Sequence, residues 1–194
     1  MTLATVKRFT IAEYHRLTEL GFFAEDEKVE LIRGEIVKMA AKGTRHTTVN
    51  KRLLRELFNL IGNKATLQNQ DPVMMPTEDS EPEPDIVILR NREDDYLERH
   101  PLPEDILLLI EVAGSSLNYD QQVKLELYAE NSISDYWIFN LNENCLEYYS
   151  EPYQTAAGKF GYRKKVIFLQ NEAVNLPYFP DLLLDLSKVF PGPV

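Results

Sequence analysis

Residues 84–112, PDIVILRNREDDYLERHPLPEDILLLIEV, contain two apolar runs separated by a charged connection. The runs, 86–89 and 106–110, hold only aliphatic side chains, which is typical of strands covered on both faces of a sheet. An acidic residue stands at one end of each run: Asp85 directly precedes the first, and Glu111 directly follows the second. We therefore expect two neighbouring buried strands, each with a carboxylate at one end.

Periodic patterns on both sides of this stretch predict the remaining elements. Thr10 and Glu13 form a capping box in front of the first helix, and Arg33-Gly34 is a hairpin turn. The predicted elements are a helix over 11–20, a hairpin over 28–39, a helix from 44 or 46 to 61, an edge strand within 65–75, a helix over 118–131, strands at 135–140, 145–150 and 163–169, and a C-terminal segment over 182–190. This order predicts an α/β (α+β) fold, a mixed sheet flanked by helices, in one domain over residues 1–194.

Composition limits the class of protein. The chain is 44% hydrophobic and 27% charged, and no apolar run is long enough to cross a bilayer. The N-terminus lacks the apolar segment of a signal peptide, and the single cysteine, Cys145, favours a reducing cytoplasm. The net charge of −10 argues against a protein that coats nucleic acid nonspecifically, although it leaves room for a locally basic cleft.

Several familiar sites are absent from the sequence. It contains no G-x-G-x-x-G, G-x-x-x-x-G-K-[ST], H-E-x-x-H or G-x-S-x-G motif. Three scattered histidines and one cysteine do not make a structural zinc site. The acids that border the buried strands are the remaining candidates for chemistry.

Asp85 and Glu111 have the character of ligands for a hard divalent cation. Burying a lone carboxylate costs several kcal/mol unless it is paired, hydrogen-bonded or bound to metal. Two carboxylates on adjacent strands suit Mg²⁺, which completes its shell with waters and phosphate oxygens. The ordinary alternatives are that Asp85 is a strand-entry loop acid, and that Glu111 faces solvent or pairs with Lys124 or an arginine.

Lys124 is the candidate for a basic group near such an ion. It lies on the helix that follows the Glu111 strand, and Asp120 precedes it at i, i+4 spacing on the same helical face. An ammonium group there would orient water or offset charge that develops on a phosphate. The ordinary alternative for Asp120 and Lys124 is a surface salt bridge.

The residues as a set resemble the Uma-type restriction endonuclease family of the PD-(D/E)XK nuclease superfamily. The resemblance rests on Pro84-Asp85, Glu111-Val112 and the D-x-x-x-K-x-x-x-Y pattern of residues 120–128, and it spans nearly the whole chain. It implies a restriction-endonuclease-like sheet that holds Mg²⁺ or Mn²⁺. By this resemblance the metal ligands are Asp85, Glu111 and the Val112 backbone carbonyl, the catalytic lysine is Lys124, and its supporting neighbours are Asp120 and Tyr128.

Two positions depart from the pattern of the superfamily or family. Ala113 stands where the superfamily usually has its lysine, so Lys124 on the helix would supply that group. Asn140 ends its strand where relatives commonly have aspartate. No predicted role depends on Asn140.

Two further residues are candidates for support. Glu30 in the hairpin matches a family position and would assist the metal site, whereas an exposed strand acid is the ordinary interpretation of Glu30 and Glu35. His46 begins a helix in the most basic stretch of the chain, which could contact phosphate or be a solvated helical face. The members of that stretch are Lys42, Arg45, Lys51, Arg52 and Arg55.

The sequence thus predicts a cytoplasmic, Mg²⁺- or Mn²⁺-dependent endonuclease that hydrolyses phosphodiester bonds in DNA. By analogy with enzymes that cut two strands, a homodimer is expected. Two other functions stay open: a catalytically inactive binding or regulatory module with the same fold, and a metal-dependent hydrolase of smaller phosphate esters.

Overall fold

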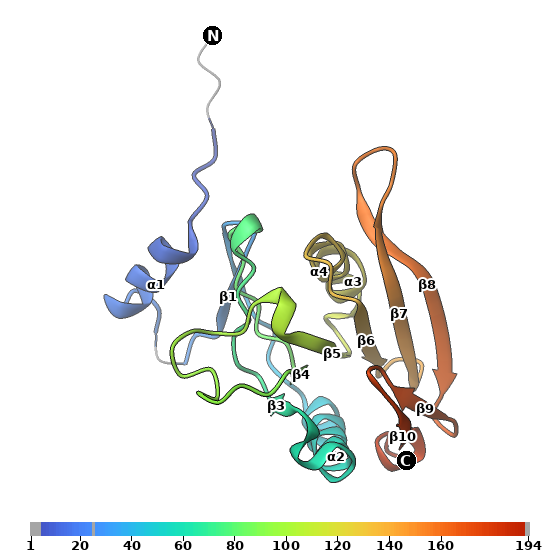
Figure 1. Cartoon of the computed structure of the whole chain (residues 1–194). Helices are drawn as coiled ribbons and strands as arrows, with labels where there is room; N and C mark the ends of the chain where they lie inside the picture. Colours follow the sequence, from blue (N-terminus) through green and yellow to red (C-terminus); the bar gives the residue numbers. More distant parts are fainter. Residues whose placement is uncertain (1–4, 25, 193–194) are drawn as a thin grey trace.

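The computed structural model describes residues 5–24 and 26–192 (Figure 1). The helices are α1 (Ile11–Glu19), α2 (Thr44–Ile61), α3 (Leu117–Tyr119) and α4 (Leu125–Glu130), and a π-helical turn, Asp120–Lys124, joins the last two. Short 3-10 turns lie at Gly62–Lys64, Pro76–Glu78, Pro103–Asp105 and Leu186–Lys188. The strands are β1 (Val29–Ile32), β2 (Glu35–Lys38), β3 (Thr66–Gln68), β4 (Ile86–Leu89), β5 (Ile106–Ala113), β6 (Asp135–Asn140), β7 (Cys145–Gln154), β8 (Phe160–Leu169), β9 (Ala173–Leu176) and β10 (Phe179–Asp185).

A six-stranded mixed sheet in the order β3-β4-β5-β6-β7-β8 forms the centre. All neighbouring strands are antiparallel except β5 and β6, which run parallel. A parallel pair requires a crossover connection, and α3, the π-turn and α4 provide it. Figure 1 shows α1 and the β1–β2 hairpin at one end of the molecule and the long β7–β8 hairpin at the other.

Each face of the sheet is covered by different elements, because successive residues of a strand point to opposite sides. In β4, Ile86 and Ile88 pack with α2 and the β9–β10 hairpin, whereas Val87 and Leu89 pack on the side of α4. The same alternation places Glu111 on the α4 side, between Leu109 and Ala113. The continuous apolar runs of the sequence therefore mark strands that are buried on both faces, as predicted.

The N-terminal part attaches to the chain segment that leads into β4. The predicted capping box of Thr10 and Glu13 opens α1. Leu31 of β1 forms an isolated antiparallel bridge with Glu81. Gly34 in the β1–β2 turn has a φ of +74° and accepts a hydrogen bond of 2.8 Å from the Phe9 amide. These contacts fix the hairpin beside the entrance of β4.

Three predicted elements differ in detail from the structure. The strand expected within 65–75 is confined to Thr66–Gln68, and the chain then runs irregularly through Pro72. The helix over 118–131 contains the π-turn, so it is not a regular α-helix. The C-terminal segment is part of the β9–β10 hairpin and its closing 3-10 turn. The prediction of one domain over the whole chain stays a prediction.

Within the described ranges, 5–24 and 26–192, no helix combines the length and apolarity needed to cross a membrane.

Candidate active site

The antiparallel pairing of β4 and β5 brings Asp85 and Glu111 together. The register pairs Ile86 with Ile110, and continuing it by one residue places Asp85 opposite Glu111. The amide of Val112 donates a hydrogen bond of 2.9 Å to Asp85 Oδ2, which ties the carboxylate to the neighbouring strand. Both carboxylates lie at the same end of the sheet, and both side chains are buried.

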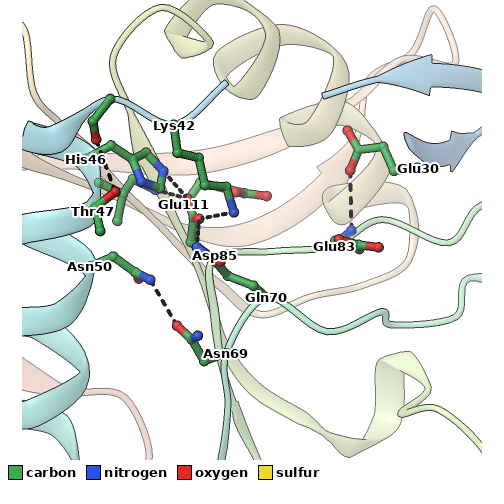
Figure 2. Close-up of polar contacts among 12 residues, drawn as sticks. Glu30, Lys42, His46, Thr47, Asn50, Asn69, Gln70, Glu83, Asp85 and Glu111 are labelled. Carbon is green, nitrogen blue, oxygen red and sulfur yellow. Dashed lines mark hydrogen bonds and ion pairs between the residues drawn. The ribbon is translucent and has the colours of Figure 1, made fainter. Parts of the chain in front are cut away.

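Four groups contact the two oxygens of Asp85. Figure 2 labels three of them, His46, Lys42 and Gln70. Oδ2 lies 3.0 Å from His46 Nε2 as well as near the Val112 amide. Oδ1 lies 3.3 Å from Lys42 Nζ and accepts a 3.1 Å hydrogen bond from Gln70. Burial alone would raise the pKa of Asp85, but the hydrogen bond and charge of His46, with Lys42 and the Val112 amide, hold that pKa below its usual range. Asp85 is therefore a carboxylate held in one orientation.

Glu111 is held by residues of the crossover connection. Lys124 Nζ donates a 3.0 Å hydrogen bond to Glu111 Oε1, and the Tyr128 hydroxyl donates one of 2.9 Å to the same oxygen. Lys124 also forms an ion pair of 3.1 Å with Glu30 of β1. The β1–β2 hairpin, the sheet and the crossover thus meet at one buried ammonium group.

The π-turn sets the positions of Asp120 and Lys124. Its wide turn is closed by the Leu125 amide, which donates to the Asp120 carbonyl, and the Tyr136 hydroxyl donates to the same carbonyl at 3.2 Å. Gln121 donates to the buried carboxylate of Glu147 on β7 at 2.8 Å. π-Turns are often found at functional sites, and this one turns both charged side chains into the protein.

The four acids Glu30, Asp85, Glu111 and Asp120 repel one another electrostatically. Burial raises the pKa of Glu111 to about 8; Asp120, Asp85 and Glu30 act in the same direction, and Lys124 acts against them. Burial likewise raises the pKa of Asp120 to about 6, again with Lys124 in opposition. The mutual charge of the acids raises the pKa of Lys124 well above its usual value, although burial acts against that shift. Asp85 is paired with Lys42 and His46, whereas Glu30, Glu111 and Asp120 together hold more acid than the Lys124 ammonium group balances.

A pocket of about 530 Å³ opens over this cluster. The four acids and Lys124 line one part of it, together with Ser115, Ser116 and Tyr119 from the start of the crossover. Another part is lined by Lys38, Lys42, Arg45 and His46, from β2 to the first turn of α2. Despite the net negative charge of the chain, this part of the pocket is locally basic, and it borders the acidic cluster.

Asp85 and Glu111 fit a hard divalent cation. They offer oxygen ligands from adjacent strands, and burial together with the nearby acids raises the pKa of Glu111, a shift that a bound cation would offset. No group of three or more His, Cys, Asp or Glu side chains suited to a metal converges in the described part of the chain. An ion held by these two carboxylates would complete its shell with waters and substrate oxygens, as Mg²⁺ does.

All eight predicted site residues lie in or against this cluster. The Val112 amide donates to Asp85, and the role of the Val112 carbonyl as a metal ligand stays a prediction. Tyr128 donates to the same oxygen of Glu111 as Lys124, so the two side chains meet at that carboxylate. Asp120 and Lys124 are both buried, so the alternative of a surface salt bridge is wrong.

Burial also decides between the alternative interpretations of the hairpin acids and of His46. Glu30 is buried, so the interpretation of an exposed strand acid is wrong for it and correct for Glu35. The His46 side chain is 15% exposed and contacts Asp85, so it is not part of a solvated helical face. Glu81, in the segment that leads into β4, is also buried and lies 2.8 Å from His15.

Gln70 is the site residue that sequence reasoning missed. Its side chain donates to Asp85, and its backbone has a φ of +59° in the irregular segment after β3. Nothing in the surrounding sequence, QNQDP, distinguishes it from an ordinary polar loop residue. Its role depends on a contact across 15 residues that no local pattern records.

The fold matches a solved nuclease-like structure. The crystal structure titled as a putative nuclease belonging to DUF820 from Anabaena variabilis aligns with a TM-score of 0.72 at 14% identity, over 94% of this chain and 97% of that one. At this identity the likeness shows the shared fold, and it confirms the predicted mixed sheet flanked by helices. None of the curated proteins compared with the chain matches it.

The family follows from the sequence match. Residues 11–187 match the Uma2 family, described as "Putative restriction endonuclease". Because this match covers most of the chain, the chain belongs to the Uma2 family, and the predicted family resemblance is confirmed. Family membership and fold together support a nuclease.

Proposed function

We propose that the chain is a divalent-metal-dependent endonuclease that hydrolyses phosphodiester bonds in DNA. The observation that carries this proposal is that Asp85 and Glu111 lie opposite each other on β4 and β5 in one pocket, with Lys124 hydrogen-bonded to Glu111. Asp85 and Glu111 would hold Mg²⁺ or Mn²⁺. Such an ion would polarise the phosphodiester and lower the pKa of a water molecule.

The side chains around the two carboxylates would each have a defined task. Lys124 is positioned to donate to water or to a phosphate oxygen, and its charge would stabilise the negative transition state. Glu30, 3.1 Å from Lys124, keeps that ammonium group charged and in place. His46 and Gln70 fix the two Asp85 oxygens, so that the carboxylate needs little reorganisation to bind an ion.

Cleavage of plasmid DNA with Mg²⁺, with Mn²⁺ and with EDTA tests the proposal. We expect cleavage only with a divalent ion, and a loss of at least ~100-fold in Glu111→Ala and in Lys124→Ala, on the scale of removing one catalytic group. Glu81→Ala is the matched control for Glu111→Ala, because Glu81 is also a buried glutamate but lies outside the pocket. Unchanged cleavage in both site variants would show that the chemistry occurs elsewhere.

The pocket volume makes a smaller phosphate ester the second candidate substrate. A volume of about 530 Å³ lies in the range of small-molecule sites. Hydrolysis of a nitrophenyl phosphodiester without cleavage of plasmid DNA would favour it, and single-stranded DNA and RNA complete the comparison. Absence of Mn²⁺ binding by calorimetry, in the native chain and in Asp85→Ala alike, would instead favour an inactive binding module. Formation of a homodimer stays a prediction.

A further inference from the structure

One segment of this acidic protein carries positive charge alone. Residues 36–55 include six of the 21 Lys and Arg residues and none of the 31 Asp and Glu residues. A solvated surface usually mixes charges of both signs. The six cations are Lys38, Lys42, Arg45, Lys51, Arg52 and Arg55.

Three of these six cations, Arg45, Lys51 and Arg55, lie on one exposed side of α2. At 100° per residue, Thr44, Arg45, Thr48, Lys51 and Arg55 fall within about a third of the helix circumference. All five are exposed, and we call them the α2 basic face. The opposite side of α2 packs on the sheet through Val49, Leu53, Leu57 and Ile61.

The α2 basic face begins at the pocket. Arg45 lines the pocket, and it is followed along the helix by Lys51 and Arg55. From Arg45 to Arg55 the helix rises about 15 Å, a length along which one strand of B-DNA places about four phosphates. The site residue His46, next to Arg45, contacts Asp85 directly. A polyanion lying on this face would therefore continue into the pocket.

Outside the α2 basic face, Lys38 pairs with Glu27 and Lys42 with Asp85. The three cations within the α2 basic face make few internal contacts. Arg55 is 3.6 Å from Glu56, and Arg45 donates to the Asn144 side chain at 2.5 Å. The exposed ion pair of Arg55 contributes little to stability. Arg52 differs from the others, because it is half-buried and donates to the Phe190 carbonyl at 3.2 Å. We therefore assign it a structural role.

We infer that the α2 basic face binds the backbone phosphates of duplex DNA and leads the strand into the pocket. This inference rests on the proposed function for the choice of DNA. With a net charge of −10, the chain repels a polyanion over most of its surface, so a one-sign patch beside the site determines where DNA approaches. Phosphate contacts fix the position and register of DNA without reading its sequence.

Fluorescence anisotropy of a labelled duplex, measured on the full chain in EDTA over a series of salt concentrations, tests the inference. The double variant Lys51→Ala/Arg55→Ala removes two phosphate contacts, so the slope of log affinity against log salt should fall by about 2. We expect affinity to fall at least ~10-fold at about 50 mM salt.

A matched control separates position from net charge. Arg163→Ala/Lys164→Ala removes the same charge from an exposed basic cluster on β8, where Lys164 pairs with Glu151. We expect this control to bind within about threefold of the native chain, because a distant charge is screened by salt. Equal weakening in both double variants, or no weakening in either, would overturn the inference.

Two further outcomes separate the inference from the proposed function. Tight duplex binding that depends on Lys51 and Arg55, without cleavage in any divalent metal, would support the α2 basic face and reject the endonuclease. Metal-dependent cleavage with an unchanged KM in Lys51→Ala/Arg55→Ala would support the endonuclease and reject the α2 basic face. Preference for single-stranded RNA over duplex DNA, lost in the same variant, would overturn the assignment of the partner.

Discussion

Burial of Glu111 should make the stability of the metal-free chain fall as pH rises. Burial and the nearby acids raise the pKa of this carboxyl from an ordinary 4.5 to about 8. Between those values the folded state holds a proton that the unfolded state has released. The free energy of unfolding therefore decreases with pH across this window, by up to about 1.4 kcal/mol per pH unit. Below the lower pKa both states are protonated, and the contribution of Glu111 is fully present.

The size of the effect can be worked out where Glu111 titrates almost alone. Asp120 has a pKa raised to about 6, so its own contribution is mostly complete above that pH. Between about pH 6 and about pH 7.5, a group that keeps its proton only in the folded state lowers the free energy of unfolding by about 2 kcal/mol. This is a large fraction of the stability of a typical domain.

Urea unfolding of the native chain and of Glu111→Gln, in EDTA at several pH values in that window, measures the effect. The substituted amide would keep the shape of the side chain but has no proton to release, so the Glu111→Gln variant should lose less stability with rising pH. The difference between the two chains should change by about 2 kcal/mol over the window. Parallel stability curves, or a native chain that gains stability relative to the variant, would refute a raised pKa at Glu111.

Two further predictions concern the β1–β2 hairpin, each with a matched control. Gly34→Ala should lower the melting temperature more than Gly158→Ala does: both positions have positive φ, but a Cβ at Gly34 would lie 2.9 Å from the Phe9 carbonyl oxygen, whereas nothing lies within 4 Å at Gly158. Equal losses would show that the close approach of the Phe9 segment is unimportant. Glu30→Ala should cost more than about 1 kcal/mol in urea unfolding because it removes a buried partner of Lys124, and Glu35→Ala should stay within about 0.5 kcal/mol. Similar values for the two would argue against the buried ion pair.

The central part of the fold and the core of the candidate site could be predicted from the sequence because their signals are local. The apolar runs identify β4 and β5 from the local sequence alone. The charged connection between the runs shows that the two strands are consecutive in the chain. Once these strands pair as antiparallel neighbours, a residue that precedes one run must lie near a residue that follows the other. Asp85 and Glu111 follow from that rule.

The rest depends on contacts between distant segments. Glu30 and Lys124 are separated by about half of the chain. The alternation of side chains in a four-residue strand cannot show which face of that strand becomes buried. The π-turn has no residue signature in a single sequence, since the wide turn is fixed by partners such as Tyr136 and Glu147. For the same reason Gln70 could not be found, because only the folded chain brings it to Asp85.

The connection between β4 and β5 offers a place where this protein can change without losing its site. Residues 90–105 leave and re-enter the sheet at the end opposite to Asp85 and Glu111, and none of them lines the pocket. The amide of Arg90 donates to the Asp105 carbonyl at 2.9 Å, which closes the base of this connection. Its length is therefore uncoupled from the spacing of the two carboxylates. An added segment, a fluorescent label or a second recognition domain could be inserted near the exposed Leu97 while the chemistry at the other end of the strands keeps its geometry.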